Sequence, residues 1–333
     1  RRAGRLRYTP ADKSIIRTMD KRQETIAFLA NTAAWLSLFF LILVNLSACQ
    51  PNPIPQIIEV TPPTNTPIKI ATIVDLAADI TPTPNPPIQV ERSATPTPNN
   101  CLQNGGEIRS ASLFSEHLGE DFHFQVYLPP CYHDQPDQRY SVTYLLHGLY
   151  YNEDQWPRMG VAEQMDRLVA GGEIPPFIVI LPREARFDPP QTSAFDNALI
   201  EELIPWVDQQ YRTLADKPYR AIGGLSRGAA WSVRIGLIHY QLFDSIGAHS
   251  LPLFEADGSK VTEWLSNIPQ EDLPAFYIDI GRKDPERNSA QDFADQLDDN
   301  NVPHTWYLFN GGHTEDYWSA HLEGYLRWYA RDW

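Results

Sequence analysis

The feature that most constrains this chain is Gly224-Leu-Ser-Arg-Gly228, a G-x-S-x-G sequence. The apolar residues that precede it, from Tyr219, favour a short strand, and the residues that follow it favour a helix. A sharp strand-to-helix turn strains the backbone of its central serine, so its close neighbours must lack side chains, and glycine meets that need. We therefore predict that Ser226 is a nucleophile that stands clear of a sheet, beside the N–H groups of the next helix. A glycine-rich turn that merely contains a serine is the alternative.

The composition argues against several classes of function. The chain has 333 residues and a formal net charge of −15, whereas nucleic-acid binding requires clustered Lys and Arg to contact phosphates. The three cysteines form no C-x-x-C pair and the nine histidines show no H-x-x-H spacing, so we expect no metal and no cofactor. Cys101 and Cys131 could form a disulfide if the domain is exported, or remain two separate buried thiols.

An apolar stretch near the start of the chain predicts export. Its densest part, residues 33–44, follows the charged residues 20–24. Its length suits the apolar core of a signal peptide, which needs roughly 7–15 residues, whereas a membrane-spanning helix needs ~20. An uncleaved membrane anchor is the alternative, because the stretch approaches spanning length if Asn31 and Asn45 are included.

Leu46-Ser-Ala-Cys49, directly after this stretch, resembles the lipobox of bacterial lipoproteins. The resemblance implies that residues 1–48 are a signal peptide, in which Met19 starts translation and residues 1–18 are either untranslated or part of a long basic region. It also implies that Cys49 becomes the lipid-modified N-terminus. We therefore expect an extracytoplasmic bacterial lipoprotein that is anchored to a membrane.

Residues 49–100 have the composition of a disordered tether. Residues 50–100 contain twelve prolines and eight threonines, and Thr-Pro-Thr-Pro occurs at 81–84 and again at 95–98. Such a segment buries too little apolar surface to fold and favours extended polyproline II conformations. We predict that it holds the following domain away from the membrane.

Residues 101–333 are long enough for one α/β domain. Strands are predicted at 107–115, 122–128, 140–146, 177–181, 219–225, 245–249, 275–280 and 304–309. Helices are predicted at 161–169, 197–211, 227–240, 261–268, 289–297 and from 316. Strands that alternate with helices after an opening antiparallel hairpin predict a mostly parallel sheet covered on both faces. Ligands of such sheets bind at the carboxyl ends of the strands.

A serine nucleophile needs a base within hydrogen-bond reach and an acid that orients the base. His313 follows the last predicted strand, and an imidazole can take and return a proton near its ordinary pKa of ~6.5. Asp284 lies in the loop after the strand 275–280 and completes the order Ser…Asp…His of α/β-hydrolases. A surface histidine is the alternative for His313.

Three other carboxylates compete with Asp284 for the role of the acid. Asp279 lies within the strand, Glu286 lies two residues beyond Asp284, and Asp316 lies close to His313 in the sequence. We prefer Asp284, because a loop at the carboxyl end of a strand is where the acid of such a triad is found.

An oxyanion site needs two backbone N–H groups. We expect one from Arg227, directly after the serine, and the other from Leu149, in the loop after the strand 140–146. His147 in the same loop could be a second base, but its place beside Gly148 favours a role in bracing the loop.

Several motifs together resemble the putative-esterase family, which includes S-formylglutathione hydrolases, feruloyl, acetyl-xylan and enterochelin esterases, and mycolyltransferases. They are Tyr-Leu-Pro-Pro-Cys-Tyr (127–132), Tyr-Leu-Leu-His-Gly (144–148), Glu-Glu-Leu-Ile-Pro (201–205), Gly-Gly-Leu-Ser-Arg-Gly (223–228), Gly-Arg-Lys-Asp (281–284) and Gly-Gly-His (311–313). The resemblance implies an α/β-hydrolase fold and a serine carboxylic-ester hydrolase that forms an acyl-enzyme.

The chain departs from the family pattern at two positions. Cys131 stands where glycine is commoner, which fits a disulfide with Cys101. Arg227 stands where Met or Gln often follows the serine, and its guanidinium could meet an acidic or sugar-bearing substrate or pair with a nearby carboxylate.

Aromatic residues flank the motif loops. We expect Tyr150, Tyr151, Trp156 and Trp318 to bind substrate, because aromatic faces suit sugar rings and phenolic acyl groups, whereas Trp231 more simply packs in the core. With export, this favours feruloyl or acetyl esters of polysaccharide as substrates. The alternatives are an acyltransferase with the same triad, an esterase of siderophores or small esters, and a non-catalytic surface-binding domain.

Overall fold

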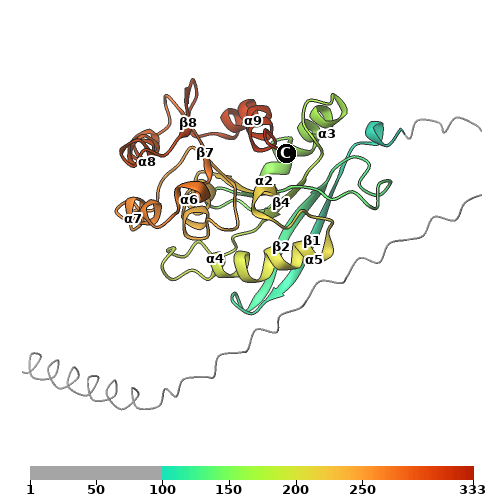
Figure 1. Cartoon of the computed structure of the whole chain (residues 1–333), viewed down its shortest axis with the longest axis horizontal. Helices are drawn as coiled ribbons and strands as arrows, with labels where there is room; N and C mark the ends of the chain where they lie inside the picture. The colour runs from blue at the N-terminus through green and yellow to red at the C-terminus, as the bar shows by residue number, and fades with distance from the viewer. Residues whose placement is uncertain (1–99) are drawn as a thin grey trace, which may run out of the picture. The chain divides into compact units, whose positions relative to one another are not determined.

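The computed structural model describes residues 100–333 (Figure 1). The predicted signal peptide, the lipidation site Cys49 and the Pro/Thr-rich segment lie in residues 1–99, outside the described residues. Eight strands form one sheet in the order β1-β2-β4-β3-β5-β6-β7-β8. They are β1 (Glu107–Ser115), β2 (Glu120–Leu128), β3 (Val142–Leu146), β4 (Ile178–Pro182), β5 (Arg220–Leu225), β6 (Ser245–His249), β7 (Ala275–Gly281) and β8 (His304–Phe309).

The predicted fold class is confirmed. Strands β1 and β2 pair antiparallel, with Glu107 opposite Leu128, and β2 pairs antiparallel with β4. All remaining pairs, from β4 through β3 to β8, are parallel. Every residue of β3 and β4 is buried, because helices cover both faces of the sheet and leave no polar face. The carboxyl ends of the parallel strands therefore converge on one edge of the sheet, where the site is expected.

The helices divide between the two faces of the sheet (Figure 1). They are α2 (Gln155–Arg158), α3 (Val161–Ala170), α4 (Phe195–Asn197), the π-helix η2 (Ala198–Leu203), α5 (Ile204–Gln210), α6 (Arg227–Ile238), α7 (Val261–Ser266), α8 (Arg287–Asp299) and α9 (Glu315–Tyr329). Three short 3₁₀ turns are η1 (Asn100–Asn104), η3 (Lys217–Tyr219) and η4 (Gln270–Asp272). One hydrophobic cluster packs the helices from α4 through α8 against one face of the sheet. A second cluster packs α3 and α9 against the other face.

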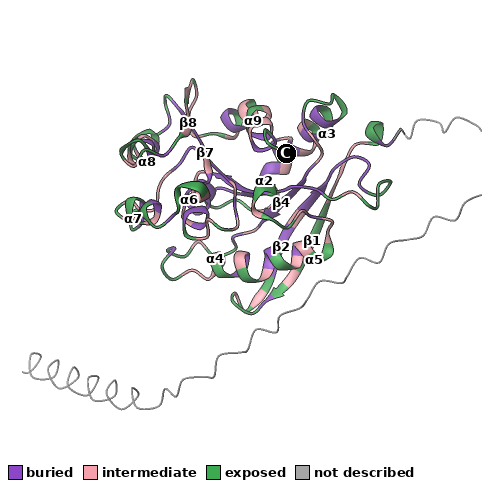
Figure 2. Cartoon of the chain, in the orientation of Figure 1, coloured by how far each residue is buried: buried purple, intermediate pink, exposed green. Residues whose placement is uncertain are grey.

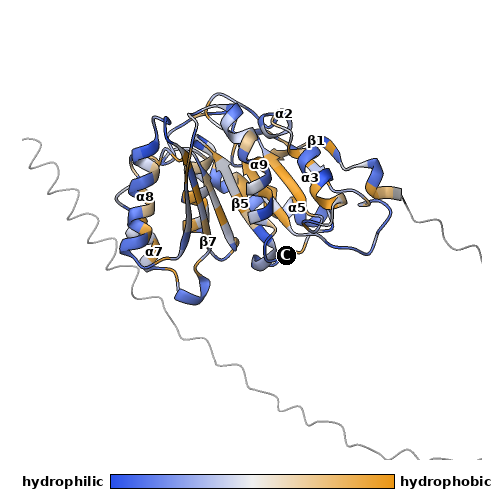
Figure 3. Ribbon diagram, turned by 90° about the horizontal axis from the view of Figure 1, so that it is seen from above, coloured by the Kyte–Doolittle hydropathy of each residue, from blue (hydrophilic) through white to orange (hydrophobic). Residues whose placement is uncertain are grey.

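The colouring of the figures agrees with this layered arrangement. The central strands are buried and the outer sides of the helices are exposed (Figure 2). Apolar residues concentrate on the strands, whereas a covering helix such as α8 is mostly polar (Figure 3). None of the helices within residues 100–333 is long and apolar enough to span a bilayer.

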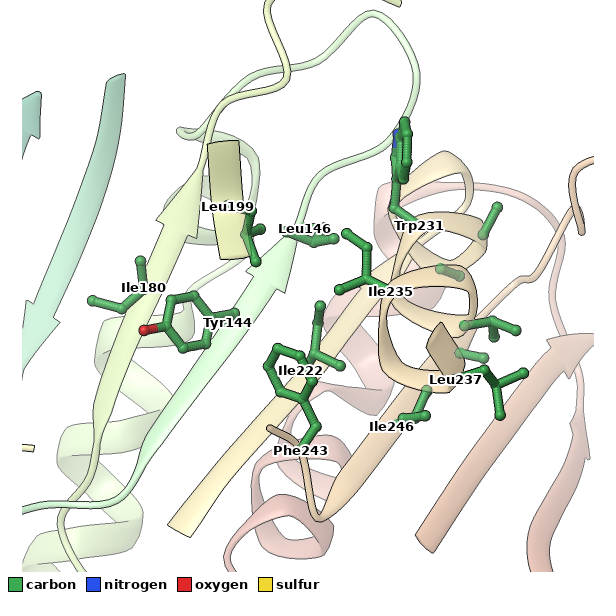
Figure 4. Close-up of a cluster of buried hydrophobic side chains, with 14 of the residues drawn as sticks. Tyr144, Leu146, Ile180, Leu199, Ile222, Trp231, Ile235, Leu237, Phe243 and Ile246 are labelled. Carbon is green, nitrogen blue, oxygen red and sulfur yellow. The ribbon is translucent and has the colours of Figure 1, made fainter. Parts of the chain in front are cut away.

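Helix α6 is the most deeply packed of the covering helices. Its Ile235 and Leu237 lie in one cluster with Leu146 of β3, Ile222 of β5 and Ile246 of β6 (Figure 4). All five side chains are at most 2% exposed. This packing holds the C-terminal part of α6 against β3, β5 and β6.

Tyr329 of α9 fills a gap in the opposite face of the sheet. A Cβ atom added to Gly223 of β5 would lie 1.7 Å from its hydroxyl oxygen, and one added to Gly247 of β6 would lie 1.8 Å from it. The same hydroxyl lies 3.0 Å from Nε2 of His249. Glycine is therefore required at both strand positions, since any larger residue would displace the tyrosine.

Two expectations about the elements are corrected. The single helix predicted for residues 197–211 is a composite of α4, the π-helical turn η2 and α5. The strand predicted from residue 140 begins at Val142, and Tyr140 makes only an isolated bridge to Thr213.

The disulfide expected between Cys101 and Cys131 is present, with a Cα–Cα distance of 5.0 Å. It joins η1 to the loop after β2. Cys131 has a φ angle of 66°, in the left-handed region that glycine adopts most readily. The backbone at this position would therefore suit glycine, and the disulfide holds a cysteine there instead.

Candidate active site

Ser226 sits in a strained turn between β5 and α6. Its φ and ψ angles are 52° and −125°, a conformation that non-glycine residues rarely adopt. A Cβ atom added to Gly224 would lie 2.4 Å from the carbonyl carbon of Gly228, and one added to Gly228 would lie 2.3 Å from the carbonyl oxygen of Leu146. Both flanking glycines are therefore needed for the turn to close against β3.

The structure brings Ser226, His313 and Asp284 into one hydrogen-bonded chain. Nε2 of His313 lies 2.8 Å from Oγ of Ser226. Nδ1 of the same ring lies 3.0 Å from both carboxylate oxygens of Asp284. Because a carboxylate only accepts, Nδ1 carries the proton, and Nε2 is left free to accept the serine proton.

Asp284 is held in its ionised form. Burial opposes ionisation, but hydrogen bonds from His313, from the N–H of Glu286 at 2.9 Å and from Ser250 outweigh it and hold the pKa of Asp284 below its ordinary value. An ionised carboxylate fixes the tautomer of His313 and stabilises the imidazolium that forms when the serine gives up its proton.

Two of the other candidate acids, Asp279 and Asp316, are engaged elsewhere or exposed, and Glu286 is half-buried and bonds to Asp284 through its backbone N–H. The carboxylate of Asp279 lies 2.7 Å from Nδ1 of His249 and accepts from the hydroxyls of Tyr317 and Tyr325 at 2.6 and 2.8 Å. Asp316 is exposed on the first turn of α9.

The loop after β3 lies directly beside the serine. A Cβ atom added to Gly148 would lie 3.6 Å from Cβ of Ser226. Gly148 donates its N–H to the side chain of Gln155 at 2.8 Å. Nδ1 of His147 lies 2.8 Å from the Gly148 carbonyl oxygen, and its Nε2 accepts from the N–H of Glu184 at 2.9 Å. His147 thus braces the loop and has no free nitrogen to act as a base.

Arg227 pairs with a carboxylate of this chain. Its Nε and one terminal nitrogen donate to the two carboxylate oxygens of Glu184 at 2.8 and 2.6 Å, and it also donates to the Asp188 carbonyl at 2.6 Å. Arg227 is the first residue of α6, and N–H groups in the first turn of a helix have no partner within the helix. The backbone N–H of Arg227 thus directly follows Ser226 at the start of α6, and the Gly148 loop that carries Leu149 also lies beside Ser226.

The family described as "Putative esterase" matches residues 115–329 of the chain. The chain belongs to this family. Its membership in the putative esterase family supports carboxylic ester hydrolase activity.

Curated relatives match part of this putative esterase domain. An endo-1,4-beta-xylanase/feruloyl esterase of Xylanibacter ruminicola is 38% identical over 151 residues, which cover 42% of this chain and 21% of the relative. Endo-1,4-beta-xylanase Y of Acetivibrio thermocellus is 28% identical over 173 residues, which cover 47% of this chain and 14% of the relative. The matched segments thus span about a fifth or less of these two longer proteins.

Solved structures share the fold of this putative esterase. A ferulic acid esterase superposes with a TM-score of 0.63 at 24% identity, covering 69% of this chain and 99% of that one. A feruloyl esterase module from Clostridium thermocellum gives a TM-score of 0.60 at 17% identity, and the match covers 71% of this chain and 93% of the module.

Two of the four aromatic residues expected to bind substrate face solvent. Tyr150 is 82% exposed and Tyr151 is 43% exposed. Both line a cavity of about 330 Å³ together with Arg158, Arg183 and Phe187. This cavity adjoins the Gly148 loop beside Ser226.

The other two aromatic residues are buried, and their contact with substrate stays a prediction. Trp156 is 1% exposed and donates its Nε1–H to the Leu146 carbonyl. Trp318 is 3% exposed, donates to Oγ of Ser250 at 2.9 Å and meets the ring of His313 edge-on, with 5.0 Å between centroids. Both side chains support the site loops from within.

Glu184, Gln155 and Ser250 contact the candidate site but were missed in the sequence. The available signal for Glu184 was its place two residues after the carboxyl end of β4, where ligands of such sheets bind. Within residues 100–333, no group of three or more His, Cys, Asp or Glu side chains is arranged to hold a metal ion.

Proposed function

We propose that the domain 101–333 is a serine carboxylic-ester hydrolase in which Ser226, His313 and Asp284 are catalytic. The observation that carries the proposal is the continuous chain of hydrogen bonds from Oγ of Ser226 through the His313 ring to Asp284. An isolated serine hydroxyl is a poor nucleophile, and this arrangement supplies both the base and the group that orients it.

The mechanism follows from these positions. Oγ of Ser226 attacks the ester carbonyl carbon while Nε2 of His313 takes its proton. The carbonyl oxygen becomes an oxyanion, which the N–H groups of Arg227 and Leu149 stabilise. His313 then gives its proton to the leaving alcohol, and an acyl group stays on Ser226. A water molecule, deprotonated by His313, attacks this acyl group, and the second tetrahedral intermediate collapses to the acid and free Ser226.

We propose feruloyl or acetyl esters of plant polysaccharide as the substrates. The name of the relative from Xylanibacter ruminicola combines a xylanase with a feruloyl esterase, which supports this class. The exposed rings of Tyr150 and Tyr151 beside the Gly148 loop offer apolar faces for a phenolic acyl group or a sugar.

We also propose that the protein works outside the cytoplasm, attached to a membrane through lipid on Cys49. The lipobox resemblance of residues 46–49 supports this location. The disulfide between Cys101 and Cys131 supports it independently, because disulfides persist in oxidising compartments.

The test of the proposed activity is Ser226→Ala. Loss of the nucleophile should lower kcat by at least ~10³-fold on p-nitrophenyl acetate and on methyl ferulate, while the residual rate reflects binding and the oxyanion site alone. Ser266→Ala, at a serine near the end of α7, should retain the activity of the unaltered chain. Undiminished hydrolysis by Ser226→Ala, or failure of the unaltered chain to react with a fluorophosphonate, would refute the proposal.

A further inference from the structure

We propose that Glu184 is a positioning residue that aligns both backbone N–H donors of the oxyanion site. The inference rests on the proposed ester hydrolysis and adds a residue that lies outside the triad. Glu184 lies two residues after β4 and is 4% exposed. Its carboxylate bonds to the guanidinium of Arg227 and its backbone N–H bonds to the ring of His147, so a single residue connects to the neighbourhood of both donors.

The carboxylate of Glu184 acts on the first donor through Arg227. Two parallel hydrogen bonds, at 2.8 and 2.6 Å, join it to the guanidinium, which is itself only 13% exposed. Such a bidentate pair fixes the plane and direction of the arginine side chain. The same residue carries the N–H that follows Ser226, and the third bond of the guanidinium, to the Asp188 carbonyl, leaves it little freedom. The start of α6 is thereby held against the loop after β4.

The backbone of Glu184 acts on the second donor through His147. Its N–H donates to Nε2 of His147 at 2.9 Å, so Nδ1 carries the ring proton and donates to the Gly148 carbonyl at 2.8 Å. That carbonyl belongs to the same planar peptide unit as the N–H of Leu149. The same carbonyl also accepts from the N–H of Tyr151 at 3.2 Å, so two bonds at the oxygen end of the unit, of which the His147 bond is the shorter, set the direction of its N–H.

A direct contact between Glu184 and substrate is the competing role. Glu184 lines the cavity of Tyr150 and Tyr151 and a second cavity of about 260 Å³ that includes His117 and Phe195. Both oxygens of its carboxylate are already bonded to Arg227, however. A positioning residue changes kcat, whereas a residue that binds substrate and transition state equally changes KM.

Helix α6 offers a matched control for the buried ion pair. Arg234, seven residues after Arg227, pairs with Asp257 at 2.7 Å. The arginine side chain is 13% exposed, as in Arg227, and the Asp257 side chain is 0% exposed. Arg234 also lies 3.9 Å from Asp196, so either substitution weakens the ion pairing of one largely buried guanidinium on the same helix, but only Glu184 connects to the oxyanion site.

The experiment compares Glu184→Gln with Asp257→Asn in the full chain. Complete loss of one oxyanion donor typically lowers kcat by ~10²–10³-fold, so misalignment by Glu184→Gln should lower kcat by ~10–10²-fold and leave KM within about twofold. Affinity for a trifluoromethyl ketone, whose adduct places an oxyanion at these donors, should fall in parallel. Asp257→Asn should keep kcat within about twofold, even if its melting temperature falls as far as that of Glu184→Gln.

Three results would overturn the inference: equal losses of kcat in both variants, a rise in KM at constant kcat, or unaltered affinity for the ketone. If Glu184→Gln does not fold, Glu184→Asp replaces it; the shorter side chain keeps the charge but cannot keep both bonds, and the same fall in kcat is expected. Failure of the proposed function is distinct, because the unaltered chain would then hydrolyse no ester.

Discussion

Burial, helped by the positive charges of Arg183 and Arg227, lowers the pKa of His147 to about 4, although the bond to the Gly148 carbonyl opposes this shift. The ring is 3% exposed, and Nε2 accepts the Glu184 N–H, so protonation would break a bond and bury a charge. Protonation of His147 would therefore disturb the loop that carries Leu149 and would also destabilise the folded chain.

This linkage predicts how stability depends on pH. Between pH ~6.5 and about 4 the unfolded chain protonates residue 147 and the folded chain does not, so the free energy of unfolding falls as the pH falls. The loss of stability is absent above pH ~6.5 and reaches at most ~3 kcal/mol by pH 4. Urea unfolding at pH 4.5, 5.5, 6.5 and 7.5 should show a smaller decrease for His147→Gln than for the unaltered chain. Equal decreases in both proteins would contradict the assignment.

At this scale the sequence identified residues whose constraint is local. Ser226 could be predicted because its backbone conformation demands glycines two residues away on each side, and His313 because it follows the last strand. Glu184 is 43 positions from Arg227, and nothing in the sequence links the two. The burial of Trp156 was equally inaccessible, because an aromatic residue near a loop has the same sequence pattern whether it faces solvent or the core.

Helices α6 and α9 cover opposite faces of the sheet, and each contains a glycine with a different physical role. The backbone of Gly228 in α6 touches the end of β3, because a Cβ atom added to Gly228 would lie only 2.3 Å from the Leu146 carbonyl oxygen. Gly324 in α9 has open space, since the nearest atom to an added Cβ is the Tyr277 hydroxyl at 4.0 Å.

The two glycines predict opposite effects of the same substitution. Gly228→Ala should force α6 away from β3 and lower the free energy of unfolding by ~1–3 kcal/mol, with loss of esterase activity. Gly324→Ala should raise it by ~0.5–1 kcal/mol, because alanine is the better helix former, and leave activity unchanged. Denaturant unfolding and kcat of both variants provide the check, and destabilisation by Gly324→Ala would show that α9 is packed more tightly than these distances indicate.

The boundaries of strands were easier to predict than those of helices. The bounds of β1, β6 and β8 agree with the predicted ones, although β1 alternates between partly buried and exposed residues, β6 is buried throughout and β8 is mostly half-buried. The region 197–211 keeps an apolar periodicity through its π-helical turn, which the pattern cannot distinguish from continuous α-helix. Helix α8 begins two residues before and ends two residues after its predicted bounds, and no side chain caps its N-terminus.

For the whole molecule, the proposed lipid anchor predicts where the esterase activity is found. Wild-type chain expressed in a bacterium that processes lipoproteins should sediment with the membranes, since cleavage before Cys49 leaves acyl chains on that residue. Cys49→Ser should not be lipidated, and an uncleaved signal segment would then be the only attachment. Mass spectrometry of the mature N-terminus identifies which form is present.

The variant Ser266→Ala serves as the control, because it alters neither the lipobox nor the disulfide and should stay in the membrane fraction. An N-terminus upstream of Cys49 in the wild-type chain, with no acyl mass, would support the uncleaved anchor and contradict lipidation.

The tyrosine that fills the gap beneath Gly223 and Gly247 has a consequence for biosynthesis. Tyr329 lies 80 positions after His249, its partner at the end of β6. On the ribosome, strands β5 and β6 are therefore synthesised long before the side chain that seals their glycine surface emerges. A nascent chain stays incompletely closed during that interval, and a translocation channel that accepts only unfolded polypeptide would find it still in a transportable state.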